Sequence, residues 1–295
     1  MAAKKRFYKS VLLADDGLSI QLDGRHLRSP AGSLLSLPTP SLAMAIADEW
    51  RAQGDDIDPA TMPLFSLAVT VIDRVTPQRD MVMAELAAYG GNDLLCYRDS
   101  QTDLASRQHD QWQPWLDRLA AEQDIHLDIV TGIMPIGQND AVKFVPLIAA
   151  HDDWQLGILH RVTSLSGSLV LGLAFVSMMI DSDKMFDLAF LDELWQNEKW
   201  GTDFEAADRH GFLRAEFFCI ALPDWHNASN NLKMDIMFGG QPVQPRLPLI
   251  MLAAGEISLR ITITKQIIPT IGSKFGNHHI TLRCHPINHG DGKAE

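Results

Sequence analysis

The stretch VTSLSGSLVLGLAFVSMMI, residues 162–180, contains no charged residue and is bracketed by charged residues on both sides. As a helix with a rise of about 1.5 Å per residue, it would be roughly 28 Å long, which is enough to cross a bilayer. Its hydroxyl groups, and the lack of a Lys or Arg cluster beside it, favour a helix buried in a helical bundle. Ser164, Ser168 and Gly172 recur every fourth position, so one face would let a neighbouring helix approach closely. We therefore expect one continuous core helix, with a membrane span as the weaker alternative.

The composition is that of an ordinary globular protein, with 46% hydrophobic and 21% charged residues in a chain of 295, long enough for two domains. The formal net charge of −12 argues against nucleic acid or an anionic membrane surface as the partner, because both are bound chiefly through Lys and Arg. Cys96, Cys219 and Cys284 lie far apart, which predicts no disulfide framework and fits a reducing compartment. The basic start MAAKKRFYKS has no apolar run after it, so we expect no secretory signal and a cytoplasmic protein.

Residues 1–90 are predicted to form a β-rich domain with packed helices. Apolar residues alternate with polar ones between positions 7 and 37, and the dipeptide Asp23-Gly24 between such runs predicts a hairpin. Thr39-Pro40 and Thr76-Pro77 each pair a capping residue with a first-turn proline, and so predict two helix starts. A further helix is expected over residues 64–75.

Residues 91–223 are predicted to form an antiparallel helical bundle. Its helices are expected over residues 102–123, over residues 139–150 in a weaker form, through the charge-free stretch, from Ser182 to Gly201, and onward from Thr202. The fold class is therefore α+β, with a small N-terminal β-rich domain followed by the helical domain. Residues 224–295 lose the acidic excess and become rich in Asn, Gly, Pro and His, which predicts an atypical, unassigned extension that could be partly disordered. The last helix is expected to carry the apolar residues Phe204, Phe212, Leu213, Phe217 and Ile220.

No common catalytic signature is present, because GxGxxG, GxxxxGK[ST], HExxH and GxSxG are all absent. The serines of SGS, residues 166–168, are expected in mid-helix, where a nucleophile would be buried without a base. A histidine-rich tail carries residue types that zinc sites use, although their spacing matches no common pattern. We expect no metal and no cofactor, with a small metal-dependent enzyme as the alternative function. The tail residues are His278, His279, Cys284, His285 and His289.

The acidic run DELWQNEKWGTDFEAAD, residues 192–208, has two interpretations. Its acids could be solvated charges that cap two helices, with Trp195 in the core. Alternatively, Trp200 and the surrounding acids form a recognition surface, because Trp is enriched among interface anchors. Trp50, beside Glu49, poses the same choice, and core packing is favoured there.

Several motifs in this order resemble the family of ATP synthase assembly chaperones that hold the α subunit of the soluble F₁ head. They extend over about residues 6–222 and comprise RFYK near the start, DEW with IDPATMPL and IDRV, YGGNDLLCYR, LSGSLVLGLA, and WQNEKWGTDFEA. The resemblance implies a β-rich domain followed by a helical one, and no enzymatic activity. It also implies a bacterial cytoplasmic member that is monomeric when free and does not insert stably into membranes.

The function that the resemblance implies is that of a holdase. Such a protein binds free α subunit, prevents its aggregation, and leaves when the β subunit arrives. The resemblance marks Trp50 and the acids of the WQNEKWGTDFEA motif as functionally sensitive. Together with the interface argument, it gives the expected partner-binding residues Trp50, Glu193, Glu198, Trp200, Asp203 and Glu205.

Overall fold

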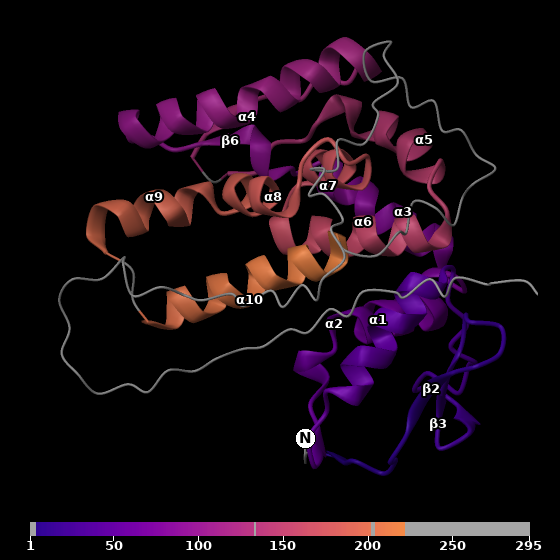
Figure 1. Ribbon diagram of the computed structural model, residues 1–295. Helices are drawn as coiled ribbons and strands as arrows, with labels where there is room; N and C mark the ends of the chain where they lie inside the picture. The colour runs from indigo at the N-terminus through magenta and orange to yellow at the C-terminus, as the bar shows by residue number, and fades with distance from the viewer. Residues whose placement is uncertain (1–3, 133, 202–203, 222–295) are drawn as a thin grey trace, which may run out of the picture. The chain divides into compact units, whose positions relative to one another are not determined.

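The computed structural model describes residues 4–132, 134–201 and 204–221, all of which belong to one compact unit. Short strands are confined mainly to the N-terminal part and helices dominate the rest, which confirms the predicted α+β class (Figure 1). Contacts of α2 (Pro63–Thr70) with α6 (Asp153–Ser166) and α10 (Phe204–Ala221) connect the two parts. So do contacts of α3 (Arg79–Gly90) with α5 (Phe144–Ala149), α6 and α7 (Leu169–Val176). The boundary near residue 90 stays a prediction, and the expected extension, residues 224–295, lies outside the described residues.

The predicted hairpin is confirmed. Three short strands form an antiparallel sheet in the order β2-β3-β4, with Val11 opposite Leu22. Asp23 and Gly24 have φ angles of 50° and 78°, the left-handed pair that a two-residue hairpin turn requires. A second, two-stranded sheet joins the start of the chain to the segment after α1. The strands are β1 (Lys4–Lys5), β2 (Val11–Leu13), β3 (Ile20–Leu22), β4 (Arg25–His26) and β5 (Asp56–Ile57).

Helices α1 and α2 follow the local signals in the sequence. The hydroxyl of Thr39 accepts a hydrogen bond from the Leu42 amide at 3.3 Å and so caps α1, whose apolar face packs on the sheet. Glu49 on α1 then accepts hydrogen bonds from the Leu64 and Phe65 amides, both at 2.8 Å, at the N-terminus of α2. Burial raises the pKa of Glu49 to about 7. The elements are α1 (Pro40–Arg51), η1 (Pro59–Thr61), α2 (Pro63–Thr70), the π-helical turn η2 (Val71–Val75) and α3 (Arg79–Gly90).

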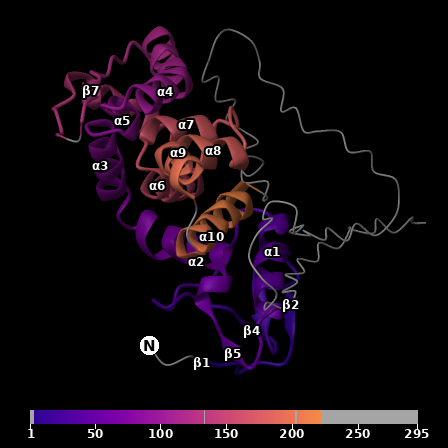
Figure 2. The ribbon, with the colours of Figure 1, turned by 90° about the vertical axis from the view of Figure 1, so that its left-hand side faces the viewer.

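The remaining described elements are helical apart from the parallel pair β6 and β7 (Figure 2). Helices α6 and α7 pack on each other in the interior, and α8 and α10 pack together beside them. The elements are η3 (Leu94–Cys96), β6 (Tyr97–Arg98), α4 (Thr102–Gln123), β7 (Val130–Thr131), η4 (Asn139–Lys143), α5 (Phe144–Ala149), α6 (Asp153–Ser166), α7 (Leu169–Val176), α8 (Ser182–Ala189), α9 (Leu191–Trp200) and α10 (Phe204–Ala221).

The charge-free stretch 162–180 is largely buried, with Ser164 and Met178 exposed, but the prediction of one continuous helix is wrong. Helix α6 ends at Gly167, whose φ of 73° is a left-handed cap conformation that favours glycine. The Ser168 hydroxyl then accepts a hydrogen bond from the Leu171 amide at 3.0 Å and starts α7. The SGS serines therefore lie at a junction between two helices. None of the described helices is both long and apolar enough to cross a membrane.

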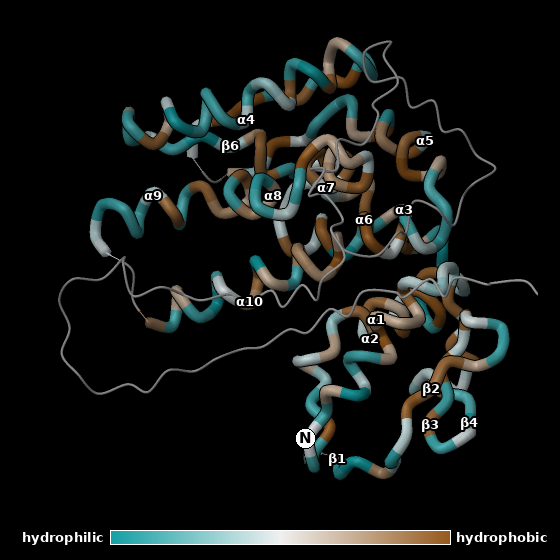
Figure 3. Tube along the Cα trace, viewed as in Figure 1, coloured by the Kyte–Doolittle hydropathy of each residue, from teal (hydrophilic) through white to brown (hydrophobic). Residues whose placement is uncertain are grey.

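The buried carboxylate of Asp93 ties this junction to the connector before β6. It accepts hydrogen bonds from the amides of Leu95 and Val170, each at 3.0 Å. Asp93 is fully buried, and burial raises its pKa to about 6. All eight residues of α7 are buried, and Figure 3 shows the apolar character of this interior.

The expected helix over residues 182–201 is also divided. Asp181, rather than Ser182, caps its start by accepting a hydrogen bond from the Lys184 amide at 2.8 Å. Helix α8 ends at Phe190, whose ψ of 25° is not helical, and α9 begins at the next residue. The acidic run therefore begins on a separate short helix, α9.

Candidate protein-interaction surface

Helix α9 is only ten residues long and contributes two fully buried side chains, Leu191 and Trp195. Trp200 at its end is 69% exposed, although its ring meets the edge of Trp195 at a centroid distance of 5.5 Å. Gly201 ends the helix with a φ of 87°, a backbone conformation that favours glycine. The short helix thus holds one tryptophan in the core and presents another to solvent.

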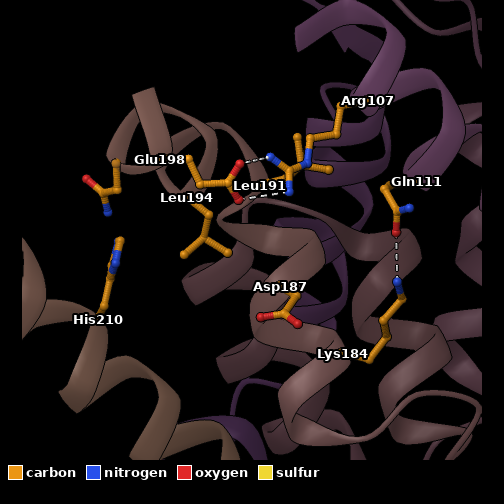
Figure 4. A pocket seen from close by; sticks show the side chains of 9 residues that line it. Arg107, Gln111, Lys184, Asp187, Leu191, Leu194, Glu198 and His210 are labelled. Atoms are coloured by element: carbon orange, nitrogen blue, oxygen red, sulfur yellow. Dashed lines mark hydrogen bonds and ion pairs between the residues drawn. The ribbon is translucent and has the colours of Figure 1, made fainter. Parts of the chain in front are cut away.

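Glu198 lies on α9 and pairs with Arg107 on α4. Two hydrogen bonds at 2.6 and 2.9 Å join the guanidinium to both carboxylate oxygens (Figure 4). These bonds hold the pKa of Glu198 below its usual range and raise that of Arg107. Both side chains are largely exposed, so the pair contributes at most about 1 kcal/mol to stability. A competing cation could therefore replace Arg107 at a small energetic cost.

Glu193 joins α9 to α10. Its carboxylate accepts a hydrogen bond from the ring of His210 at 2.7 Å and pairs with Arg209. Glu205, in the first turn of α10, is exposed and has no ion pair among the described residues. Asp203 lies outside the described residues. The structure thus brings Glu193 and Glu198 onto one helix with Trp200 and leaves Glu205 free in solvent.

Trp50 occupies a different cluster. Its side chain is only 5% exposed and lies between Tyr8 and Phe65, with ring centroids 5.4 and 5.0 Å away. The Tyr8 hydroxyl donates a hydrogen bond to the Trp50 carbonyl at 2.6 Å. Trp50 is therefore packed in the core, which is the alternative that the sequence favoured. A contact between Trp50 and a partner stays a prediction.

A groove of about 600 Å³ opens between α4, α8, α9 and α10 (Figure 4). Its apolar residues are Leu191 and Leu194, and most of its polar groups already have partners: Arg107 pairs with Glu198, and Lys184 donates a hydrogen bond to Gln111 at 2.8 Å. A partner could enter it only by exchanging polar contacts. The lining residues are Arg107, Gln111, Lys184, Asp187, Leu191, Leu194, Asn197, Glu198 and His210.

The sequence interpretation missed the exposed aromatic residues of α10. The sequence placed this helix in the bundle without distinguishing its faces, but Phe204 and Phe212 are 79% and 72% exposed. Only Phe217 and Ile220 are fully buried. The spacing separates two faces, because Phe204 and Phe212 differ by eight residues and share a face that excludes Phe217, but it does not show which face is buried.

The described residues form no group of three side chains suited to holding a metal ion. The hydroxyls of Ser166 and Ser168 engage backbone groups at the junction of α6 and α7. The tail histidines proposed for the alternative function lie outside the described residues. What the described surface offers is an exposed tryptophan and exposed phenylalanines, side-chain types that are enriched in protein interfaces, with acids nearby.

Comparisons with known proteins identify relatives of this chain. The model of the family described as "ATP12 chaperone protein" matches residues 5–120. Two solved structures of Atp12 from Paracoccus denitrificans, one with lysine in place of an aspartate, are 38% identical to this chain with a TM-score of 0.65. They cover 74% of this chain, and this chain covers 95% and 96% of theirs.

A more distant relative is the mitochondrial protein atp12 of Schizosaccharomyces pombe. It is 22% identical over 249 residues, which make up 77% of this chain and 86% of the relative. An identity of 38% over nearly the whole Paracoccus protein is high enough to show that the two proteins belong to the same family. This chain belongs to the ATP12 chaperone family, the ATP synthase assembly chaperones that its sequence motifs predicted.

Proposed function

We propose that this chain is a holdase for the free α subunit of F-type ATP synthase. It binds a surface of α that the β subunit later covers, prevents aggregation, and is displaced when β arrives. The protein acts without catalysis, in the bacterial cytoplasm, and is a monomer when free. Membership in the ATP12 family supports the general role, while the identity of the client and the exchange with β are parts of the proposal.

The observation that carries the proposal is the exposure of both Trp200 and Glu198 in the last turn of α9. Burying an exposed tryptophan is favourable, and a partner that covers its side chain would gain this stabilisation. A specific interface of ordinary size buries roughly 1,600 Å². Displacement requires that the holdase bind α more weakly than β does, because exchange then proceeds by mass action. An anchor of one tryptophan and a few acids fits such a moderate affinity.

Glu198 and Arg107 offer a matched pair of variants that tests the proposal. Denatured α subunit is diluted into buffer with the full chain, and aggregation is followed by light scattering. If Glu198 contacts a cation of the client, Glu198→Gln weakens protection and binding roughly tenfold, since a hydrogen bond to a charged group contributes about 1.5–3 kcal/mol. Arg107→Gln frees the same carboxylate and leaves binding unchanged or stronger.

Unchanged helical circular dichroism is the control for folding in both variants. Glu198→Lys places a second cation beside Arg107 and should abolish protection. Equal losses in Glu198→Gln and Arg107→Gln would mean that the pair only holds α9 on α4. Full-length wild-type protein that fails to suppress aggregation of α would contradict the proposed function itself.

A further inference from the structure

Helix α10 has apolar residues on two opposite faces. Phe217 and Ile220, which are 0% and 2% exposed, pack into the bundle formed with α8, α6 and α2. Phe204, Phe212 and Phe218, which are 79%, 72% and 41% exposed, point away from it. We call these three residues the aromatic face of α10. Figure 1 shows α10 lying along one side of the helical part, below α8 and α9.

This concentration of exposed aromatic side chains is unusual for the chain. Among the described residues, the exposed aromatics are Phe7, Trp200 and the three phenylalanines of the aromatic face. Four of these five therefore fall within residues 200–218. Single exposed apolar residues are ordinary, whereas a cluster of large ones marks an interaction site.

The charges of α10 indicate the kind of partner. Its cations are directed inward: Arg214, for example, lies over the Phe186 ring at 4.3 Å. The acids Glu205 and Asp208 are exposed and form no ion pair among the described residues. Asp208 is four residues from both Phe204 and Phe212 and so shares their face. The inward pairs are Arg209 with Glu193, His210 with Glu193, and Arg214 with Asp183 and Asp187.

We propose that the aromatic face of α10 binds an apolar segment of the client that is flanked by Lys or Arg side chains. Apolar residues of the segment cover the phenylalanines, and its cations approach Asp208 and Glu205. This inference rests on the proposed function and extends the client surface from the end of α9 along α10. The unpaired acids favour a basic partner over a second copy of this strongly acidic chain, whose net charge is −12.

The test measures the affinity of full-length variants for purified α subunit by isothermal titration or surface plasmon resonance. Phe212→Gln and Asp208→Lys are each expected to weaken binding about tenfold, because both remove a complementary contact. The controls are Met134→Gln, at a residue that is 76% exposed, and Asp110→Lys, at an exposed acid of α4; both should bind like the wild type. Since all four sites are exposed, unchanged unfolding midpoints are expected throughout.

The outcomes separate this inference from the proposed function. If the wild type does not bind α, both the inference and the proposed function are contradicted. If the wild type binds and Phe212→Gln and Asp208→Lys bind equally well, only the aromatic face is excluded. Self-association of the wild type that Phe212→Gln abolishes would assign the face to a second copy. Tighter client binding by Phe212→Gln would indicate that residues 222–295 of the same chain cover the face, and either result overturns the inference.

Discussion

Two carboxylates, Asp93 and Glu49, act as backbone caps from positions at or near the core. Each accepts hydrogen bonds from two amides at a helix start, Asp93 at η3 and α7 and Glu49 at α2. Burial raises the pKa of both, because ionisation is less favourable away from water. The protein therefore holds ionisable groups at structural junctions, where their charge state affects stability.

Asp93 provides a prediction with a defined sign. Its pKa rises from 3.8 to about 6 on folding, so the folded state binds the proton more tightly than the unfolded state. Its contribution to the free energy of unfolding is thus largest below pH 4, decreases up to about pH 6, and then stays constant. The stability difference between wild type and Asp93→Asn should fall by on the order of 3 kcal/mol between pH 4 and pH 7.

Urea unfolding of both proteins at several pH values measures this difference, and subtraction removes the titration of Glu49, which both contain. A difference that stays constant with pH would show that Asp93 is not protonated in this range. The sequence could not predict its role, because its partner Val170 lies 77 residues away. Only the tertiary structure brings the two together.

At the scale of helices, capping and turn residues predicted the ends of elements better than the hydrophobic pattern did. The hairpin turn at Asp23-Gly24, the cap at Thr39, and α4 over residues 102–123 are found where the sequence placed them. The core helix was predicted as continuous because its uniform apolar character outweighed two residues, Gly167 and Ser168. Those residues end one helix and cap the next, and the close packing of α6 on α7 depends on this break.

Gly172 tests this packing. A Cβ at this position would collide with the Thr163 hydroxyl and lie 3.1 Å from the Leu159 Cδ1 atom, both on α6. Gly172→Ala should lower the free energy of unfolding by about 1–3 kcal/mol, as expected for overpacking. Gly211→Ala on α10 is the matched control: no neighbour lies within 4 Å, so it should raise stability by up to about 1 kcal/mol through helix propensity. Urea unfolding of the two variants should move in opposite directions, and a neutral Gly172→Ala would show that α6 and α7 separate easily.

For the molecule as a whole, the sequence motifs predicted the family and the α+β architecture, and both are confirmed. The extent of the interaction surface was harder to predict. Periodicity identifies apolar residues but cannot show which of two apolar faces a helix buries, and α10 has both. The exposure of Phe204 and Phe212 depends on where α2, α6 and α8 lie, which is a property of the assembled bundle.

The most direct test of the central claim is an exchange experiment with purified subunits. Full-length chain and α subunit are mixed, the complex is isolated by size-exclusion chromatography with light scattering, and β subunit is then added. The account predicts a stable complex with α that dissociates as β is added, which leaves α with β and returns the free chain as a monomer. No complex with α, or a complex that persists in excess β, would contradict it.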